Sequence, residues 1–375
     1  MSQHLEYAIP KHALQLNLNL NRDDPDPYDK EEQGIPADVP AAAPSICGMP
    51  LKYVSLVTLA VQNALLTLIM HYSRVSTPPD ETYSAATAVL LTELLKGSIS
   101  LLVAFSRLDV CAPTPMSPSR MLLHRAKRLA KEVFRADCWK LSIPAILYVV
   151  QNNLQFVAVS NLEAATFQVS YQMKILTTAA FSVAMLRKKL APAKWASLFL
   201  LALGVGIVQI QNTSHGSSSS GPEHEMSPFK GFMAVIAACF TSGLAGVYFE
   251  MVLKNSQADL WVRNVQLSLF SLLPALVPVF LSSSPSSPSL SLSGLFAHFG
   301  PWAWATVAVQ VLGGLLTALV IKYADNILKG FATSLSIVLA FFASAALFGF
   351  RMSPSFLAGA SVVLAASWMY NQPDA

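Results

Sequence analysis

The segment from Gln151 to Gln211 begins QNNLQFVAVSNLEAATFQVSYQMKILTTAAFSVAML and decides the fold class. It contains two apolar runs, and a helix needs roughly 20 apolar residues to cross the hydrocarbon core of a bilayer. Polar side chains nevertheless lie inside these runs or at their edges: Gln151, Asn152, Asn153, Gln168, Tyr171 and Lys174. A charge at membrane depth costs about 2.5–3.5 kcal/mol on insertion scales, so we interpret Lys174 as a functional residue.

Phe167, Tyr171 and Lys174 follow one another at spacings of four and three residues. This spacing predicts that the three side chains share one helical face. An aromatic stripe that ends in a cation suits a flat ring carrying phosphate, which is our hypothesis for the ligand of this segment.

The composition indicates a membrane protein. Hydrophobic residues make up 53% of the chain and charged residues only 12%, whereas soluble domains average about 25% charged residues. The net charge of +4 is spread over short connectors, which argues against a nucleic-acid partner. The four cysteines have neither metal-ligand nor disulfide-framework spacing, so we expect no metal site and no cofactor.

Residues 1–50 are polar and rich in proline, and we expect a disordered tail there. Apolar runs follow at about 51–71, 84–106, 141–160, 164–186 and 193–211, and then at about 229–253, 260–281, 302–322, 326–349 and 355–371. The sequence therefore predicts an all-α polytopic membrane protein with ten transmembrane helices.

Lysine and arginine are concentrated in the connectors after the second and fourth runs. The connectors after the odd-numbered runs hold only Arg74, Lys230 and Arg351. Cytosolic loops collect positive charge, so we expect both termini on the cytosolic side.

The two sets of five runs suggest internal repetition. The turn SNLEAATFQVS in the first half resembles ADNILKGFATS in the second, so that Asn161 matches Asn326. An odd number of spans per half inverts the second copy, which is typical of transporters with a substrate site between the halves. We therefore expect two inverted five-helix repeats, at 51–211 and 229–371, joined by a lumenal linker at 212–228.

Polar residues of the second half lie at corresponding places. Lys322 closes one run, and Asn326 and Lys329 begin the next. The alternative for these lysines is that they snorkel to the membrane surface. Glu93 and Lys96, three residues apart, are expected to neutralise each other as a mostly structural pair. Six glycines are expected to be close-packing points of helices: Gly204, Gly206, Gly243, Gly246, Gly313 and Gly314.

Two lysines facing one cavity would suit a polyanion, because the ammonium group is a compact phosphate partner. Amides such as Gln151 and Asn152 can read a base or a sugar, and aromatic faces accept a planar base. A phosphorylated nucleoside fits this set better than an amino acid or an inorganic ion. An empty site with two cations is costly, so exchange of one nucleotide for another should outrun net transport.

Three segments carry a family resemblance: residues 151–186 quoted above, SGLAGVYFEMVLKNSQADLWVRNVQLSLF at 242–270, and KYADNILKGFATSLSIVLA at 322–340. They resemble the nucleotide-sugar transporter family of the drug/metabolite transporter superfamily, over about residues 50–371. Within it the chain looks most like the members that carry UDP-galactose. The resemblance implies a multi-pass Golgi carrier that exchanges a cytosolic nucleotide sugar for a lumenal nucleoside monophosphate, UMP here, without enzymatic activity.

The family's functional positions correspond to Lys174 and Lys322 around the phosphates, Asn152 near the nucleoside, and Tyr248. With the residues singled out above, the expected substrate-binding set is Lys174, Lys322, Asn152, Gln151, Tyr171, Phe167, Tyr248, Asn326 and Lys329. CMP-sialic acid transporters resembling this chain have a tyrosine where it has Phe167, which favours UDP-sugars.

Several alternatives remain open from the sequence. UDP-N-acetylglucosamine and CMP-sialic acid are the other substrates within the family, and a proton-coupled drug exporter centred on Glu93 is the alternative outside it. A multi-pass glycosyltransferase would need acidic residues placed for metal or base chemistry, and a channel would need a ring of like charges. Membrane lipid is an expected partner, and a homodimer is one alternative for the oligomeric state.

Overall fold

The computed structural model describes residues 45–46, 49–78, 81–108, 117–215, 226–254, 259–281, 295–323, 326–348 and 353–372. The chain divides into two units, Met1–Pro44 and Ser45–Ala375. The predicted tail lies outside the described residues, apart from the strands β1 (Ser45–Ile46) and β2 (Met49–Pro50), which pair in antiparallel fashion.

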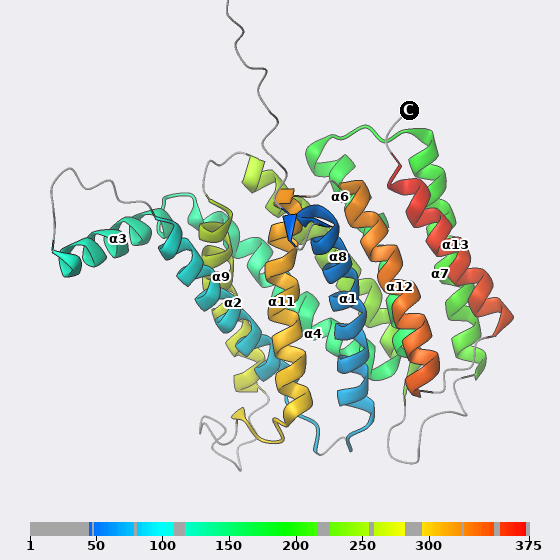
Figure 1. Ribbon diagram of the computed structural model, residues 1–375. Helices are drawn as coiled ribbons and strands as arrows, with labels where there is room; N and C mark the ends of the chain where they lie inside the picture. The colour runs from blue at the N-terminus through cyan, green and yellow to red at the C-terminus, as the bar shows by residue number, and fades with distance from the viewer. Residues whose placement is uncertain are drawn as a thin grey trace, which may run out of the picture. The chain divides into compact units, whose positions relative to one another are not determined.

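The regular structure of the described residues beyond these strands is helical (Figure 1). In chain order the helices are α1 (Leu51–Val75), α2 (Ala85–Arg107), α3 (Pro118–Val133), the 3-10 helix η3 (Cys138–Leu141), α4 (Ser142–Asn161), α5 (Ala164–Ser170), the 3-10 helix η4 (Tyr171–Met173), α6 (Lys174–Leu186), α7 (Pro192–His215), α8 (Pro228–Lys254), α9 (Leu260–Leu281), α11 (Pro301–Tyr323), α12 (Asn326–Phe348) and α13 (Pro354–Tyr370). Each predicted apolar run coincides with a helix, and the run at 164–186 is divided among α5, η4 and α6.

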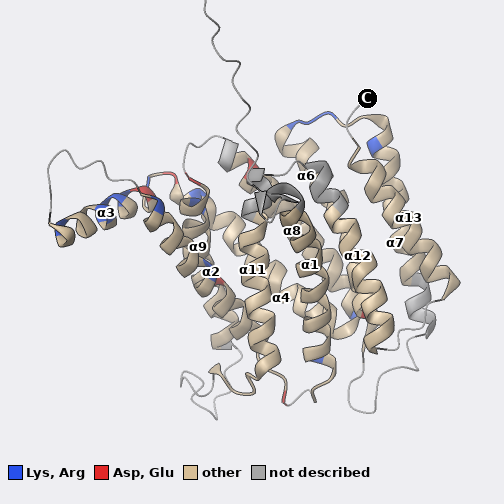
Figure 2. Cartoon of the chain, in the orientation of Figure 1, with Lys and Arg blue, Asp and Glu red and all other residues tan. Residues whose placement is uncertain are grey.

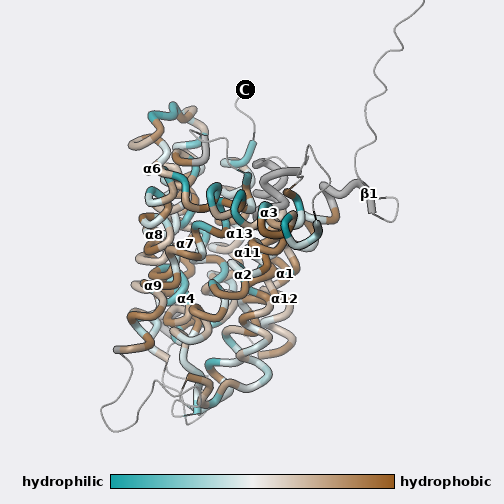
Figure 3. The backbone as a smooth tube through the Cα atoms, turned by 90° about the vertical axis from the view of Figure 1, so that its left-hand side faces the viewer, coloured by the Kyte–Doolittle hydropathy of each residue, from teal (hydrophilic) through white to brown (hydrophobic). Residues whose placement is uncertain are grey.

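Length and hydropathy identify this bundle as a multi-pass membrane protein. Six of the described helices are long and apolar enough to cross a bilayer: α1, α2, α4 together with η3, α7, α8 and α9. The described parts of α12 and α13 are shorter apolar helices. Figure 3 shows the same property along the chain, because the bundle helices are largely brown whereas α3 carries teal turns.

The outer surface of the bundle is apolar. Phe199, Leu273 and Leu347 are each about 70% exposed, at 71%, 72% and 69%, which is unfavourable in water and favourable against lipid tails. Exposed tryptophans lie near helix ends: Trp139, Trp195, Trp302, Trp304 and Trp368. Tryptophan is enriched at the two membrane–water interfaces, so these positions indicate where the bilayer surfaces lie.

The helices pack in long pairs, α4 along α8, α7 along α13 and α2 along α9, while α1 packs against both α11 and α12. Glycine permits some of these approaches. A Cβ on Gly243 would lie 2.6 Å from the Thr177 Oγ1 atom, and one on Gly204 would lie 3.0 Å from the Gly359 carbonyl. Gly313 and Gly314 face the side chains of Gln62 and Lys96 in the same way.

The expectation of close packing is wrong for Gly206 and Gly246, because a Cβ at either position would meet no atom of the described residues within 4 Å. Glycine is frequent in membrane helices for several reasons. Sequence therefore does not distinguish a glycine that faces a neighbouring backbone from one that faces open space.

Local sequence signals define several helix ends. The Ser84 hydroxyl accepts from the Thr87 N–H and caps α2, and Ser353 caps α13 in the same way just before Pro354. Helix α6 ends at Leu186, and its C-cap Arg187 adopts a left-handed conformation with φ 51°. Lys188 and Lys189 follow in the connector to α7.

Helix α3 is an additional element that the predicted runs did not include. It begins at Pro118 after Ser117, and it projects to one side of the bundle in Figure 1. Its last turns pack on α2 and α9, where Leu129 and Val133 are buried with Trp261 and Val265.

The connector after α3 is fixed to α9 by an ion pair. Asp137 accepts a hydrogen bond from the guanidinium of Arg263, 2.5 Å away, and Arg263 also donates to Gln266 at 2.8 Å. Gln266 in turn donates to the Val133 carbonyl at 2.6 Å. The Arg263 hydrogen bond keeps the pKa of Asp137 below its ordinary value of 3.8.

Candidate functional site

The predicted span at 164–186 is a broken helix. The α-helical turns of α5 end at Ser170, the backbone tightens to a 3-10 turn at Tyr171–Met173, and α6 begins at Lys174. The side-chain amide of Gln172 donates to the Gln168 carbonyl at 3.3 Å. Such local side-chain bonds compete with the regular ladder, and a 3-10 turn inside a helix often marks a functional hinge.

The aromatic stripe predicted from spacing is present across this break. The rings of Phe167 and Tyr171 stack with centroids 5.4 Å apart and an interplanar angle of 18°. The Lys174 Nζ atom lies 4.9 Å from the centroid of the Tyr171 ring. This is cation–π geometry, which is worth about 0.5–2 kcal/mol depending on desolvation. Tyr171 therefore connects an apolar ring on one side to a cation on the other.

The Tyr171 hydroxyl is held by two amides of α4. Gln151 donates to it at 2.7 Å and Gln155 at 2.6 Å. The other polar atom of the Gln151 amide, its Oε1, is buried and has no hydrogen-bond partner among the described residues. A buried acceptor without a partner is unusual, and it is available to a donor on a ligand. We did not select Gln155 from the sequence, although its spacing of four residues from Gln151 places both on one face of α4.

Further polar contacts join the broken helix to its neighbours. Gln168 accepts from Thr67 of α1 at 2.7 Å and donates to Ser336 of α12 at 3.0 Å. Gln209 of α7 donates to Ser170 at 2.6 Å, and Thr177 donates to the Cys239 carbonyl of α8 at 2.7 Å. With the α4 amides, the segment thus makes hydrogen bonds to five different helices. A polar hub of this kind inside a membrane bundle indicates function, because each group is costly to bury.

The remaining predicted site residues lie in three other places. Asn152 is half-buried on α4, beside Gln151. Tyr248 lines a hollow of about 210 Å³ together with Asp137, Trp139 and Lys140. It is nine residues beyond Cys239 on α8, or about 13 Å along the helix axis. The described contacts of Tyr171 with α8 include Cys239 but not Tyr248.

Three predicted residues belong to the second half of the chain. Lys322 is near the end of α11, and Asn326 and Lys329 are in the first turns of α12. Their side chains lie outside the described residues, so their part in the site stays a prediction. Helix α12 packs against α1 and α5, and its Ser336 contacts the polar hub at Gln168.

An ion pair and a histidine–carboxylate contact involve residues near the helix ends or the core. Lys96 donates to Glu93 at 2.7 Å, and Glu93 is 1% exposed, as expected for a mutually neutralising pair. Glu163, in the turn between α4 and α5, lies 3.7 Å from the His71 Nε2 atom, and burial raises the pKa of Glu163. Within the described residues there is no group of three or more His, Cys, Asp or Glu that could hold a metal ion.

Comparison with known proteins connects this geometry to a family. The profile described as nucleotide-sugar transporter matches residues 47–371. The chain is 45% identical to a UDP-galactose transporter of Schizosaccharomyces pombe, over 87% of this chain and 89% of that protein. It is 47% identical to the human UDP-galactose translocator, over 86% of this chain and 78% of that protein.

A second group of relatives carries different names. The human UDP-N-acetylglucosamine transporter is 43% identical, over 85% of this chain and 95% of that protein. All of these alignments extend over most of the described helices and include the polar hub. This chain, a multi-pass membrane protein with a broken polar helix among its packed helices, belongs to the nucleotide-sugar transporter family.

Proposed function

We propose that this protein carries UDP-galactose from the cytosol into the Golgi lumen in exchange for UMP, by alternating access in the Golgi membrane. The observation that carries the proposal is Lys174, held against the Tyr171 ring at the centre of a hub that touches five helices. A nucleotide phosphate is a favourable ligand for a lysine ammonium held among these helices.

The choice of substrate is supported by the relatives. Those named for UDP-galactose are 45–47% identical to this chain, and those named for UDP-N-acetylglucosamine are 43% identical. The second group makes UDP-N-acetylglucosamine the alternative substrate. Phe167 has no hydroxyl and stacks on Tyr171, so it offers no hydrogen bond to a phosphate. This supports a uridine nucleotide over CMP-sialic acid.

Helix packing supports ten transmembrane helices in two inverted repeats. We take α1, α2, α4, α5–α6 and α7 to correspond, in that order, to α8, α9, α11, α12 and α13. Replacing each helix by its counterpart then converts every main helix–helix contact into a contact that is also present. The pair α4–α8 becomes α11–α1, α6–α8 becomes α12–α1, and α4–α9 becomes α11–α2, and all of these pairs are in contact. The pairs α2–α9 and α7–α13 map onto themselves. A carrier whose halves exchange roles in this way can open to either side.

Charge placement supports an orientation with both termini in the cytosol. Figure 2 shows blue residues on α3 and on the connector between α6 and α7, at the same end of the bundle. That connector holds Arg187, Lys188 and Lys189. Because positively charged loops stay on the cytosolic side, this end faces the cytosol in our proposal.

We assign the parts of the nucleotide to residues as follows. Lys174 and Lys322 bind the phosphates, and Asn152 contacts the nucleoside. The free Oε1 atom of Gln151 accepts from an N–H of the uracil base. Asn326 and Lys329 line the path at the start of α12, and Tyr248 acts at the cytosolic mouth, where Lys140 lines the same hollow. With no nucleotide bound, two cations repel in a low-dielectric cavity, so the loaded carrier crosses faster than the empty one.

The test is counterflow in liposomes that contain the purified protein and are preloaded with UMP. Labelled UDP-galactose, UDP-N-acetylglucosamine and CMP-sialic acid are offered in parallel, and we expect UDP-galactose uptake to be fastest. Lys174→Ala should lower the exchange rate by more than about 100-fold, because the substrate then loses a partly buried charge partner worth several kcal/mol.

The matched control is Lys194→Ala. Lys194 also lies over an aromatic ring, with its Nζ atom 5.9 Å from the Tyr370 centroid, but it belongs to the first turn of α7. We expect this variant to exchange at the wild-type rate. Full exchange by Lys174→Ala would refute the proposed phosphate role. Faster uptake of UDP-N-acetylglucosamine than of UDP-galactose would make it the substrate, and the proposed exchange mechanism would stand.

A further inference from the structure

We propose that helix α3 and the adjoining turn form a binding site for anionic phospholipid on the membrane surface. The site is separate from the polar hub, and it depends on the proposed function only through the cytosolic orientation. It consists of an apolar stripe, a basic face and a hollow beside the last turn of α3.

The apolar stripe of α3 is covered at one end and open at the other. Leu122, Leu129 and Val133 are spaced by seven and four residues, so they share one helical face. Leu129 and Val133 are buried against α2 and α9. Leu122 is 60% exposed and its neighbour Leu123 is 56% exposed. The stripe therefore continues beyond the bundle, where an apolar medium must cover it.

The opposite face of α3 is basic. Arg120, Lys127 and Lys131 are exposed and share this face, and Arg125 and Arg128 add two more charges. Glu132 is the sole acidic residue of the helix, and its carboxylate lies 3.6 Å from the Arg128 Nε atom. Five cations against one anion leave a net charge of +4, with His124 counted as neutral. This charge is complementary to anionic headgroups, and an amphipathic basic helix lies in the interface with its apolar face toward the acyl chains.

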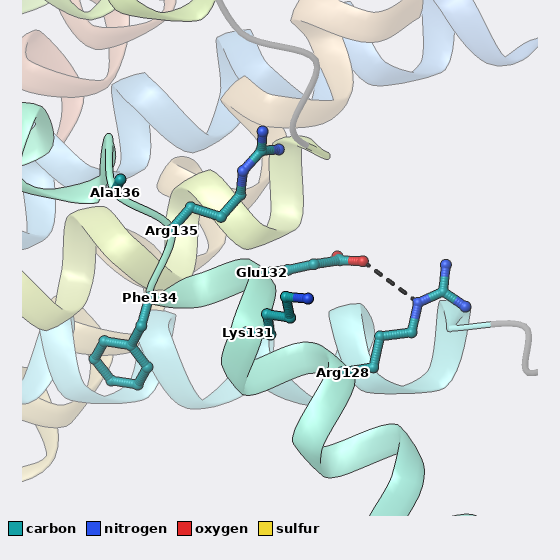
Figure 4. A pocket seen from close by; sticks show the side chains of 6 residues that line it. All are labelled: Arg128, Lys131, Glu132, Phe134, Arg135 and Ala136. Carbon is teal, nitrogen blue, oxygen red and sulfur yellow. Dashed lines mark ion pairs between the residues drawn. The ribbon is translucent and has the colours of Figure 1, made fainter.

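A hollow of about 620 Å³ lies where α3 meets the connector, and three basic residues line it: Arg128, Lys131 and Arg135. In Figure 4 the Glu132 side chain reaches toward Arg128, while the Phe134 ring points away from these polar ends. Phe134 is 68% exposed. The hollow thus offers cations to a phosphate and the adjacent ring offers an apolar contact to a lipid chain.

The position of α3 along the membrane normal supports lipid as the occupant. The exposed indole of Trp139 follows α3 by six residues and belongs to η3, which directly precedes α4. Exposed tryptophans at helix ends mark the level of the headgroups. The Asp137–Arg263 ion pair fixes this connector to α9, so α3 is held at that level. Leu122 and Leu123 are exposed at this same level, where lipid acyl chains can cover them.

The test measures amide hydrogen exchange of residues 118–133 in the full-length protein. The protein is placed in nanodiscs of phosphatidylcholine alone, or of phosphatidylcholine with added phosphatidylserine. We expect exchange in α3 to be at least about fivefold slower with phosphatidylserine, since each basic residue at an anionic surface contributes a factor of about five in affinity. Raising the salt concentration should reduce the difference, because exposed charges are screened.

The triple variant Arg120→Glu, Lys127→Glu, Lys131→Glu should lose the phosphatidylserine dependence. Lys189→Glu, in the basic connector after α6, should retain it. A second variant, Leu122→Asn with Leu123→Asn, should speed exchange in both lipid mixtures. UDP-galactose exchange, measured after the same protein preparations are reconstituted in liposomes, shows that each variant is folded. Failure of the wild type to exchange would concern the proposed function alone.

Two results would overturn the proposal. One is equal exchange of α3 with and without phosphatidylserine, which would leave a soluble protein partner as the explanation of the exposed stripe. The other is protection by inorganic phosphate alone in phosphatidylcholine nanodiscs, which would assign the hollow to a soluble anion.

Discussion

The polar hub around Tyr171 and the surface helix α3 both place basic side chains beside aromatic or apolar groups, and they use these charges in different ways. In the hub, Lys174 lies over one ring, and that ring is fixed by the amides of Gln151 and Gln155. Helix α3 carries five basic residues, three of which share an exposed face, and Arg128 is paired with Glu132. Burial and the number of fixed partners therefore decide how much a single charge contributes to stability or to ligand binding.

Replacing two acidic residues, Glu132 in the last turn of α3 and Asp137 in the connector after it, tests this difference most strongly. Asp137→Ala leaves Arg263, which is 0% exposed, without its carboxylate partner. We expect a loss of about 3 kcal/mol in stability, because a buried charge without its counterion is strongly destabilising. Glu132→Ala removes only a surface pair and should cost about 0.3–0.5 kcal/mol. Thermal unfolding in detergent measures both, and equal effects would contradict the comparison.

Two glycines of α8 test the close approach of helices near the hub. A Cβ on Gly243 would lie 2.6 Å from the Oγ1 atom and 2.9 Å from the carbonyl carbon of Thr177 on α6. Gly243→Ala should therefore cost about 1–3 kcal/mol, as overpacking does in general. A Cβ on Gly246 would meet no atom within 4 Å in the described part of the chain, so Gly246→Ala should be neutral or stabilising by up to about 1 kcal/mol. The same unfolding assay ranks them, and a destabilised Gly246→Ala would show that α8 has a different neighbour.

Removing the Tyr171 hydroxyl tests the hydrogen bonds within the hub, with a smaller expected effect. Tyr171→Phe removes the acceptor of two amides and should cost about 1–3 kcal/mol in stability for leaving the buried donors unpaired. We expect the rate of UDP-galactose exchange to fall about tenfold. A misplaced ring that raises the activation free energy by about 1.4 kcal/mol has this effect. The control is Tyr148→Phe, which lies on α4 about one turn before Gln151 and should exchange at the wild-type rate. Equal rates for both variants would remove Tyr171 from the site.

The pH dependence of the Asp137 ion pair gives the smallest effect. Because Arg263 holds the pKa of Asp137 below 3.8, the ionised carboxylate stabilises the folded state above that value. This contribution is lost as the pH falls through the lowered folded-state pKa. The difference in unfolding temperature between the wild type and Asp137→Asn should therefore be constant from pH 7 to pH 5 and shrink below about pH 4. A constant difference at all pH values would contradict the ion pair.

The stacked stripe of Phe167, Tyr171 and Lys174 could be predicted because spacing along a helix survives a single 3-10 turn. The neutralising pair of Glu93 and Lys96 was predicted for the same reason, since both residues lie on one helix. The contacts of Gln168 with Thr67 and Ser336 could not be predicted, because they join residues about 100 and 170 positions apart. Tyr248 was grouped with the hub by family resemblance, and its position beside Asp137 and Lys140 became visible only once α8 was placed.

The sequence by itself determined that this protein crosses a membrane many times and carries a cation within an apolar helix. Hydrophobicity and helical periodicity are local properties, so they can be read from neighbouring residues. Only the tertiary structure decided which helices meet at Tyr171, which glycines face a backbone, and that α3 leaves Leu122 and Leu123 uncovered. These features depend on contacts between distant segments, and such contacts form because packing and hydrogen bonding are satisfied together across the whole bundle.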